Sequence, residues 1–264
     1  MNQTIQNDEV RRKVQERYAG VAQNREDGCG CGTGCCSGVL ESGTGAEKLG
    51  YTSDDVASVP EGSDMGLGCG NPTALASIKA GETILDLGSG GGFDAFLCSK
   101  QTGPSGKVIG VDMTSEMVSK ARKNAASGGY TNVEFRLGEI ENLPVADGTA
   151  DLIISNCVIN LSPDKSRVFT EAFRVLKPGG RIAISDIVAL QPIPESMKAD
   201  FSTYTGCVAG AAFVPDLEAM LAASGFVGIR VDVKETSRQF INGWLPGHRA
   251  GEFVASANIT ARKP

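Results

Sequence analysis

The stretch Thr83-Ile-Leu-Asp-Leu-Gly-Ser-Gly-Gly-Gly-Phe93 decides the fold. Its first part, residues 84–87, is apolar except for one aspartate and predicts a buried strand. Four of the next five residues are glycine, which lets the backbone turn sharply and approach a ligand closely. Residues 93–97 have apolar spacing suited to a helix, whose first turn presents free N–H groups. A strand, a glycine-rich turn and a helix form the opening of a nucleotide-binding βα unit.

The spacing of these glycines narrows the class of ligand. Gly88, Gly90 and Gly92 alternate, but Phe93 stands where the dinucleotide fingerprint requires a third glycine, and no Lys-Ser/Thr pair of a P-loop follows. The pattern Asp86-x-Gly-x-Gly-x-Gly resembles motif I of the class I methyltransferases that use S-adenosylmethionine. A glycine-rich turn without a ligand is the alternative, and the surrounding sequence must decide between the two.

A second strand, residues 107–112, ends in an acid. Asp112 follows Asp86 by 26 residues, close to the offset of roughly 20 at which such a carboxylate reaches a ribose hydroxyl. Met113 comes next and is suited to packing against an adenine ring. An N-cap for the next helix is the structural alternative for Asp112. Together with the glycine-rich turn, the acid favours the ribose role.

Strands and helices alternate through the middle of the chain and predict an α/β fold. The expected class is a doubly wound, Rossmann-like class I methyltransferase sheet with an N-terminal Cys/Gly-rich segment and an inserted lid. We expect three parts: residues 1–70, an α/β core over 71–190, and a lid with closing strands over 191–264. The expected strands are 83–87, 107–112, 133–137, 150–156, 181–186, 226–233 and 253–259, and the expected helices are 8–25, one around Ala74 and Ile78, 92–102, 115–127, one from Ser162-Pro163 to Pro178-Gly-Gly180, and 215–224.

Several polar or reactive residues fall at the ends of the predicted parallel strands. Ligands of such sheets bind outside the carboxyl ends of the strands, at the switch point of the strand order. We therefore expect one crevice to be lined by loops that are far apart in the sequence. The expected cofactor-binding residues are Asp86, Gly88, Ser89, Gly90, Gly92, Asp112, Met113, Glu139, Ile140 and Asn156.

Composition excludes several classes of partner. The chain of 264 residues has a formal net charge of −6 and no stripe of Lys or Arg, which argues against nucleic acid as the main partner. The N-terminus has no apolar core of a signal peptide, and no apolar run reaches the length of a membrane span. We therefore expect a cytoplasmic protein, a monomer, in which most of the eight cysteines are reduced.

Four of those cysteines lie in a glycine-rich segment near the N-terminus. Cys29, Cys31, Cys35 and Cys36 are spaced C-x-C-x3-C-C, which does not match the paired C-x2-C ligands of a zinc knuckle. Metalloid or redox chemistry is the interpretation that we favour, and incidental surface thiols are the alternative.

Three further cysteines belong to three separate elements near the expected crevice. Cys69 is on a glycine-flanked turn before the core, Cys157 directly follows the strand 150–156, and Cys207 lies among small residues of the inserted segment. Thiolates select soft metal or metalloid centres, and a trivalent arsenic or antimony centre takes three sulfur ligands and keeps one lone pair. Such a lone pair needs no general base, in agreement with the single histidine, His248, which we expect in a loop.

Five short motifs resemble the arsenite S-adenosylmethionine methyltransferases: Gly68-Cys-Gly-Asn-Pro72, Ile84-Leu-Asp-Leu-Gly-Ser-Gly90, Gly110-Val-Asp-Met113, Ser155-Asn-Cys-Val-Ile-Asn-Leu161 and Thr205-Gly-Cys207. The resemblance covers roughly residues 10–235. It implies that Cys69, Cys157 and Cys207 bind As(III), and that Cys36 or Cys35 joins the redox cycle. It also implies S-adenosylmethionine as the methyl donor and thioredoxin or glutathione as the reductant.

The sequence thus predicts an enzyme that methylates arsenite or methylarsenite. A class I methyltransferase for a small organic substrate, with incidental cysteines, is the first alternative. A thiol-rich protein that sequesters a metalloid without catalysis is the second, although the glycine-rich turn and Asp112 argue against it.

Overall fold

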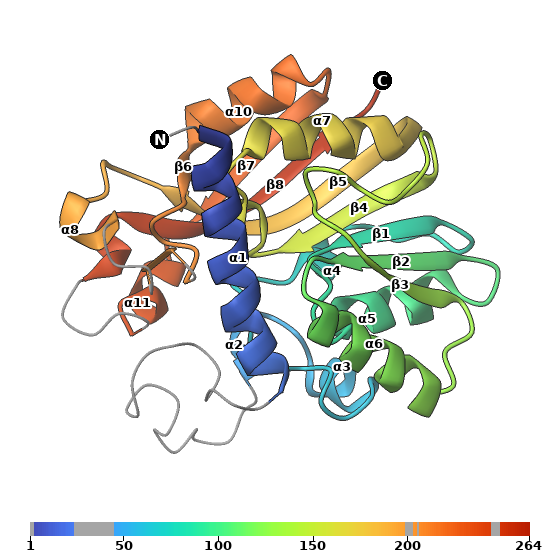
Figure 1. Ribbon diagram of the computed structural model, residues 1–264. Coiled ribbons are helices and arrows are strands. Elements are labelled where there is room, and N and C mark those ends of the chain that lie inside the picture. Colours follow the sequence, from blue (N-terminus) through green and yellow to red (C-terminus); the bar gives the residue numbers. More distant parts are fainter. Residues whose placement is uncertain (1–2, 24–44, 199–202, 205, 244–248) are drawn as a thin grey trace.

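One central sheet organises the computed structural model, which describes residues 3–23, 45–198, 203–204, 206–243 and 249–264 (Figure 1). Its strand order is β3-β2-β1-β4-β5-β8-β7, with the short β6 beside β5. Neighbouring strands are parallel from β3 to β5, whereas β8 runs antiparallel to both β5 and β7. The strands are β1 (Thr83–Leu87), β2 (Lys107–Asp112), β3 (Val133–Leu137), β4 (Ala150–Asn156), β5 (Leu176–Ala189), β6 (Ala212–Phe213), β7 (Val227–Lys234) and β8 (Val254–Arg262).

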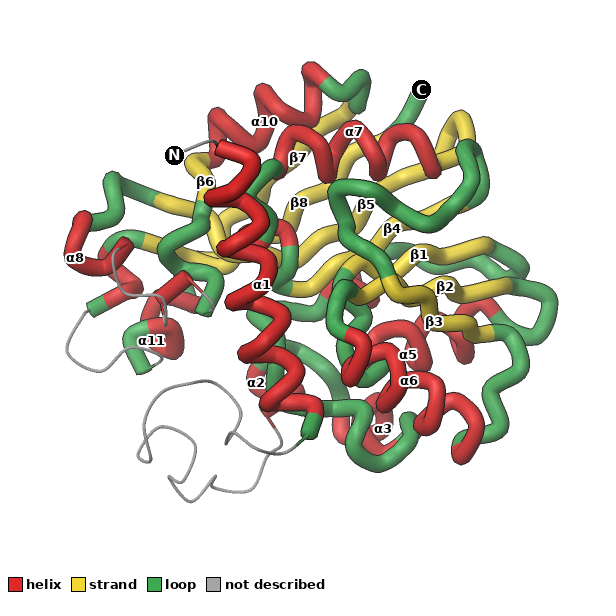
Figure 2. The backbone as a smooth tube through the Cα atoms, viewed as in Figure 1, coloured by secondary structure: helices red, strands yellow, loops and turns green. Residues whose placement is uncertain are grey.

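Helices cover both faces of this sheet (Figures 1 and 2). The main ones in the described part of the chain are α1 (Gln3–Ala22), α5 (Phe93–Thr102), α6 (Ser115–Ser127), α7 (Lys165–Val175) and α10 (Val214–Ala223). Shorter ones are α2 (Gly45–Lys48), α3 (Ser53–Ala57), α4 (Pro72–Leu75), α8 (Glu195–Lys198), α11 (Ser237–Ile241) and the 3-10 turns η1 (Ile159–Leu161) and η2 (Ala250–Glu252). The predicted α/β, Rossmann-like class is confirmed, with a mixed rather than purely parallel sheet.

The alternation of side chains along the strands creates two cores. On β1, Leu85 and Leu87 face the cluster that contains α7 and α10, whereas Ile84 faces the cluster that contains α5 and α6. On β4, Ile153 belongs to the first cluster and Ile154 to the second. Because both faces are covered, these strands are mostly apolar on both sides, as is typical of parallel sheets.

Several predicted elements have different bounds in the structure; the helix expected at 8–25 is Gln3–Ala22, for example, and the strand expected at 181–186 is Leu176–Ala189. The helix expected around Ile78 ends at Leu75, because the chain turns there through Ser77, whose φ is +44°. The helix expected from Ser162 begins at Lys165, since Asp164 is the residue whose side chain accepts from Arg167 N (3.0 Å). Residues 178–180 lie within β5 and do not end α7, which stops at Val175.

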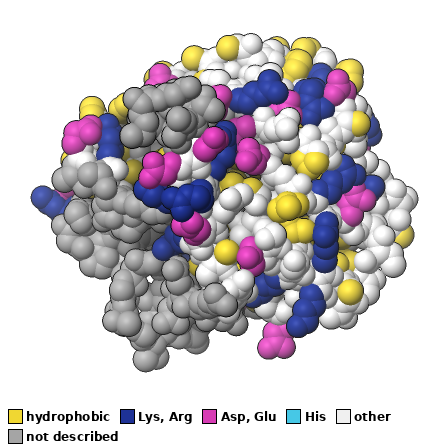
Figure 3. Space-filling view, in the orientation of Figure 1, with side chains coloured by type: hydrophobic (Ala, Val, Ile, Leu, Met, Phe, Trp, Pro, Cys, Tyr) yellow, Lys and Arg dark blue, Asp and Glu magenta, His cyan; other side chains and the backbone are white. Residues whose placement is uncertain are grey.

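The helix α1 crosses the front of the molecule, between the half that contains β1–β3 and the half that contains β7 and β8 (Figure 1). It contacts α6, and its side chains Val14 and Val21 are buried. On the face shown in Figure 3, basic and acidic side chains are interspersed, with no stripe of one sign. Among the described residues, no helix combines the length and the apolar character needed to cross a bilayer.

Candidate active site

A cavity of about 270 Å³ opens at the carboxyl ends of β1, β2 and β4. Segments that are far apart in the sequence form its wall, and they include Gly88, Asp112, Ile140 and Asn156. Residues of α1 close the cavity on the side away from the sheet. The loops after the parallel strands therefore share one wall, as the strand order requires.

The glycine-rich turn is fixed against β2. Gly88 N and Ser89 N both donate to Val111 O, at 2.8 and 3.1 Å. Gly88 has a φ of +71°, and a Cβ at this position would lie 2.3 Å from Val158 Cγ2, so only glycine fits. Gly90 N donates to Asp112 Oδ2 at 3.0 Å, which ties the turn to the end of β2. The free surface of the turn faces the cavity.

Three carboxylates gather beside this turn. Burial raises the pKa of Asp86 well above its usual range and that of Asp94 to about 6, and the nearby carboxylates add to the effect. Burial also raises the pKa of Asp112, against the N–H groups of Thr114 and Gly90 that it accepts from. Asp86 Oδ2 and the hydroxyl of Ser89 are buried without a hydrogen-bond partner in the described chain. Unpaired buried acceptors of this kind suit a ligand that brings positive charge and donors.

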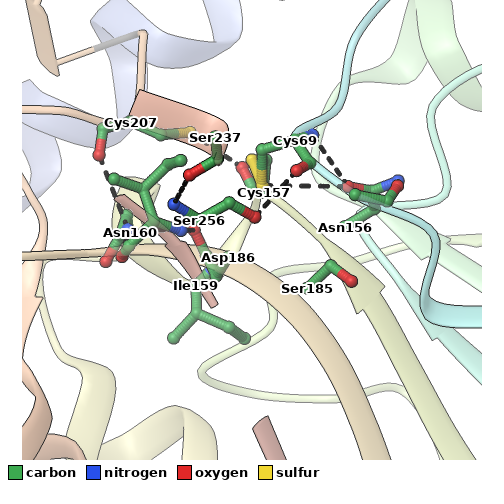
Figure 4. The surroundings of a disulfide bond; sticks show 12 residues. Cys69, Asn156, Cys157, Ile159, Asn160, Ser185, Asp186, Cys207, Ser237 and Ser256 are labelled. Atoms are coloured by element: carbon green, nitrogen blue, oxygen red, sulfur yellow. Dashed lines mark hydrogen bonds between the residues drawn. A yellow bond between two sulfur atoms is a disulfide. The ribbon is translucent and has the colours of Figure 1, made fainter. Parts of the chain in front are cut away.

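The three predicted cysteines lie near one another (Figure 4), and two of them, Cys157 and Cys207, line the same cavity. Cys69, from the turn before α4, is joined to Cys157 by a disulfide with a Cα–Cα distance of 5.9 Å. Cys207 is a free, buried thiol, and its Sγ donates to the Cys157 carbonyl oxygen at 2.9 Å. Three segments that are far apart in the sequence thus bring these cysteines close to one another: the sulfur atoms of Cys69 and Cys157 are bonded, and the Cys207 sulfur reaches the Cys157 backbone.

Two of these cysteines have an unusual backbone. Cys157 has a φ of +58° and Cys207 a φ of +62°, in the left-handed region that side chains with a Cβ rarely adopt. Cys157 N donates to Ser185 O (2.8 Å), which fixes the turn directly after β4. Such conformations cost free energy and persist only where the surroundings impose them, often at functional sites.

Asp186 on β5 lies beside the disulfide. One of its carboxylate oxygens and the sulfur atoms of Cys69 and Cys157 all lie within 4.8 Å of one another. The carboxylate accepts from Ile159 N (2.9 Å), Asn160 Nδ2 (2.9 Å) and Ile187 N (2.7 Å). Burial raises the pKa of Asp186 to about 6, against these donors.

The helix α1 covers the cavity and the cysteines. Val14 packs in the apolar cluster that contains Cys69 and Cys207. Gln15 Nε2 donates to Met113 O at 3.1 Å, and the Arg11 guanidinium lies 3.4 Å from Glu141 Oε1. This covering helix separates the sulfur atoms from bulk water.

Comparison with known proteins agrees with this geometry. Residues 78–241 match a family described as "Methyltransferase domain". The chain is 53% identical to an arsenite methyltransferase of Halobacterium salinarum over 97% of its own length and 67% of that protein. It is 35% identical to an arsenite methyltransferase of Mus musculus, over 83% of this chain and 58% of the relative.

A solved structure points in the same direction. The arsenic (III) S-adenosylmethionine methyltransferase of Chlamydomonas reinhardtii superposes with a TM-score of 0.61 at 31% identity, over 83% of this chain and 72% of that one. This chain belongs to the arsenite methyltransferase family. It spans 51% of the length of a further relative, the arsenite methyltransferase of Aquipseudomonas alcaligenes, with which it is 41% identical over 65% of its own length.

S-adenosylmethionine is the cofactor of this family of methyltransferases, and the cavity fits it. The cofactor carries a sulfonium, an ammonium group and two ribose hydroxyls. The buried carboxylates of Asp86, Asp94 and Asp112 complement that positive charge, and the unpaired Ser89 hydroxyl and Asp86 Oδ2 are free to bond its polar groups.

Eight of the ten residues predicted to bind the cofactor line the cavity of this arsenite methyltransferase family member: Asp86, Gly88, Ser89, Gly90, Asp112, Met113, Ile140 and Asn156. Gly92 lies outside the wall, because it is the N-cap of α5 and packs against Phe96. Glu139 is also outside, half-exposed and 3.5 Å from Arg11 Nε, and Glu141 lines the cavity in its place. The N-cap alternative for Asp112 is not what the structure has, since Thr114 precedes α6.

The cysteine predictions have mixed outcomes. The structure brings Cys69, Cys157 and Cys207 close to one another and joins the first two in a disulfide, which the prediction of mostly reduced cysteines did not anticipate. Cys35 and Cys36, with Cys29 and Cys31, lie outside the described residues, as does His248. The sequence-based prediction missed Tyr51 and Asp94: the acid was detectable from its place in the first turn after the glycines, whereas nothing local identified the tyrosine.

Proposed function

We propose that this chain transfers a methyl group from S-adenosylmethionine to trivalent arsenic held by Cys69, Cys157 and Cys207. The observation that carries the proposal is that Cys69, Cys157 and Cys207, from segments far apart in the sequence, lie near one another beside the cavity that the glycine-rich turn also lines. The relatives named arsenite methyltransferases and the motifs around the three cysteines support it.

Substrate binding requires the reduced site. Reduction of the Cys69–Cys157 disulfide by two electrons and two protons gives two thiols beside that of Cys207. The three thiols then displace the three hydroxyls of arsenous acid: three As–S bonds form, three As–O bonds break, and each thiol proton leaves with a hydroxyl as water. No separate base is needed for this exchange, in which soft sulfur ligands suit the soft arsenic centre.

The methyl transfer depends on position. Bound S-adenosylmethionine supplies an electrophilic methyl group. Cys157 lines the cofactor cavity and Cys207 contacts its backbone, so arsenic held by these sulfur atoms faces the cofactor side with its lone pair. Val14 and Leu161 pack around the cysteines and keep water out. Proximity and orientation are the sources of rate here, since no proton has to be moved.

The Cys69–Cys157 pair can also supply the two electrons that methylation of arsenic requires. Gain of a methyl cation formally oxidises arsenic from the trivalent to the pentavalent state. Cys69 and Cys157 return two electrons to arsenic when their sulfur atoms join and their two As–S bonds break. Two waters then replace the remaining As–S bond to Cys207, so that the trivalent product leaves as methylarsonous acid, one proton restores the Cys207 thiol and one proton is released. A dithiol such as thioredoxin, or two molecules of glutathione, then restores the thiols, and Cys35 or Cys36 would relay that exchange.

The first experiment measures methyl transfer from labelled S-adenosylmethionine to arsenite with a thiol reductant. We expect methylated arsenic from the wild type and a loss of roughly 100-fold or more in Cys69→Ser, Cys157→Ser and Cys207→Ser. Cys98→Ser is the matched control, because Cys98 is a buried thiol on α5 outside the site. If the triple cysteine variant kept full activity on an organic acceptor, the protein would be a small-molecule methyltransferase instead.

Further properties are part of the same proposal. A cytoplasmic location would keep the reductants at hand, and a monomer would suffice because one chain supplies the whole site; light scattering after gel filtration tests the second point. The three parts 1–70, 71–190 and 191–264 stay a prediction, although β7 and β8 of the last part complete the sheet of the second.

A further inference from the structure

Asn156 stands between the cofactor cavity and the arsenic site. It is the last residue of β4, directly before Cys157, and its side chain points toward the Cys69 turn (Figure 4). The sequence predicted that it binds the cofactor, yet its amide is already engaged on both sides by groups of the chain itself. That double engagement gives it a different role.

On the thiol side, Asn156 clamps the backbone of the Cys69 turn. Its Oδ1 accepts from Cys69 N at 3.1 Å, and its Nδ2 donates to Gly70 O at 2.8 Å. A Cβ on Gly68 would lie 3.1 Å from the amide nitrogen, so glycine lets the turn come this close. Because one backbone partner is a donor and the other an acceptor, the amide has only one orientation that satisfies both.

On the cofactor side, the same amide nitrogen reaches Asp94 and Tyr51. Asn156 Nδ2 lies 3.3 Å from Asp94 Oδ2 and 3.1 Å from the Tyr51 hydroxyl, which itself donates to Asp94 Oδ1 at 2.6 Å. Tyr51 is 5% exposed and its ring packs edge-on against Phe93. Asp94 lines the cavity in the first turn of α5, next to Asp86.

These bonds form a short, partly buried path from the Asp94 carboxylate in the cavity wall to the Cys69 turn. An ammonium group beside Asp86 and Asp94, which S-adenosylmethionine and S-adenosylhomocysteine share, would fix the Asp94 carboxylate in place, and a fixed charged acceptor holds the Asn156 amide in one position. The held amide in turn fixes the Cys69 N–H and the Gly70 carbonyl. We propose that Asn156 is a positioning residue through which cofactor binding at Asp94 orders the Cys69 thiol for arsenic.

This inference rests on the proposed function, and it predicts positive coupling between the two ligands. S-adenosylhomocysteine, which has no methyl group to transfer, should tighten the binding of arsenite to the reduced protein by about tenfold. The coupling is reciprocal, so arsenite should tighten the binding of S-adenosylhomocysteine by the same factor.

The experiment is equilibrium dialysis of arsenite against reduced protein, with and without saturating S-adenosylhomocysteine, with arsenic counted by mass spectrometry. In Asn156→Ala the tenfold ratio should fall to within about twofold of one. Asp94→Asn should lose the ratio as well, through the other end of the path, and it tests the proposal even if Asn156→Ala fails to fold.

Ser256→Ala is the matched control. Ser256 Oγ donates to the Cys69 carbonyl at 2.8 Å, so this variant loosens the same turn from β8 without touching Asp94. It should weaken arsenite binding yet keep the tenfold ratio. A wild-type ratio near one, or an unchanged ratio in Asn156→Ala, would overturn the coupling. Absence of arsenite binding in the reduced wild type would instead overturn the proposed function.

Discussion

The two ends of the cavity are built on different principles. At the cofactor end, buried acceptors stand without partners: Asp86 Oδ2 and the Ser89 hydroxyl. At the cysteine end, the buried polar groups are paired, with Asp186 accepting from three donors and Asn160 engaged on β5. At the first end, a bound ligand would supply the hydrogen-bond partners of these groups. The second is a mainly apolar cluster that surrounds the three cysteines.

The largest expected effect is a loss of folding stability when the disulfide at the cysteine end is reduced. Reduction of the disulfide opens a link between residues 88 apart, which in the chain-entropy model removes about 4–5 kcal/mol of stability. Urea unfolding with and without a phosphine reductant measures it. Cys69→Ser should be insensitive to the reductant, and an equal shift in that variant would show that the disulfide is not the cause.

The second test separates the Cys157 sulfur from its backbone. Cys157→Gly relieves the left-handed φ but removes the thiol, whereas Cys157→Ser keeps the strain and also removes the thiol. In both variants the rate of arsenite methylation should fall roughly 100-fold or more, because neither has the Cys157 sulfur that would hold arsenic in position. Binding of S-adenosylhomocysteine, followed by calorimetry, should stay within about twofold in both. Impaired cofactor binding in Cys157→Gly, measured without arsenite, would contradict the assignment of the cofactor-binding surface and the arsenic ligands to different ends of the cavity.

The third test probes the acceptors at the cofactor end. Asp86→Asn should stabilise the free protein at pH 8 by about 1–3 kcal/mol, while binding of S-adenosylhomocysteine weakens. Burial raises the pKa of Asp86, so the protonated form favours folding. That contribution is complete below the unfolded pKa of about 3.9 and is lost as the pH rises through the folded pKa. The gap in Tm between variant and wild type should therefore widen with rising pH, and a constant gap would contradict this account.

The smallest expected effect is on the stability of α1, the helix that covers both ends of the cavity. Arg11→Ala removes the pairs with Glu139 and Glu141 and should cost about 0.5–1 kcal/mol, because the arginine is partly exposed. Hydrogen exchange should become faster in α1 and remain unchanged in α7. Arg12→Ala, which removes an exposed pair with Glu16 on the same helix, serves as the control.

The sequence was informative where the chemistry is local. A strand, a glycine-rich turn and an acid at the end of the next strand follow each other within thirty residues, so the cofactor end could be predicted from one stretch. Cys69 could be placed near it because it is on a turn before the core, and Cys157 because it directly follows a strand. Cys207 could be placed there through its position in the inserted segment. The disulfide, the role of Tyr51 and the covering position of α1 depend on packing between distant segments, which periodicity does not encode.

The set of charges around the cavity has a consequence for selection among arsenic species. Among the described residues that line it, five are acidic and two are arginines. Arsenous acid is uncharged at neutral pH and meets no electrostatic barrier, whereas arsenate and phosphate are anions that these carboxylates repel. Discrimination against the pentavalent oxyanions, and against the phosphate that any cell holds in excess, would then need no dedicated filter. The same carboxylates that receive a cationic methyl donor would turn such anions away.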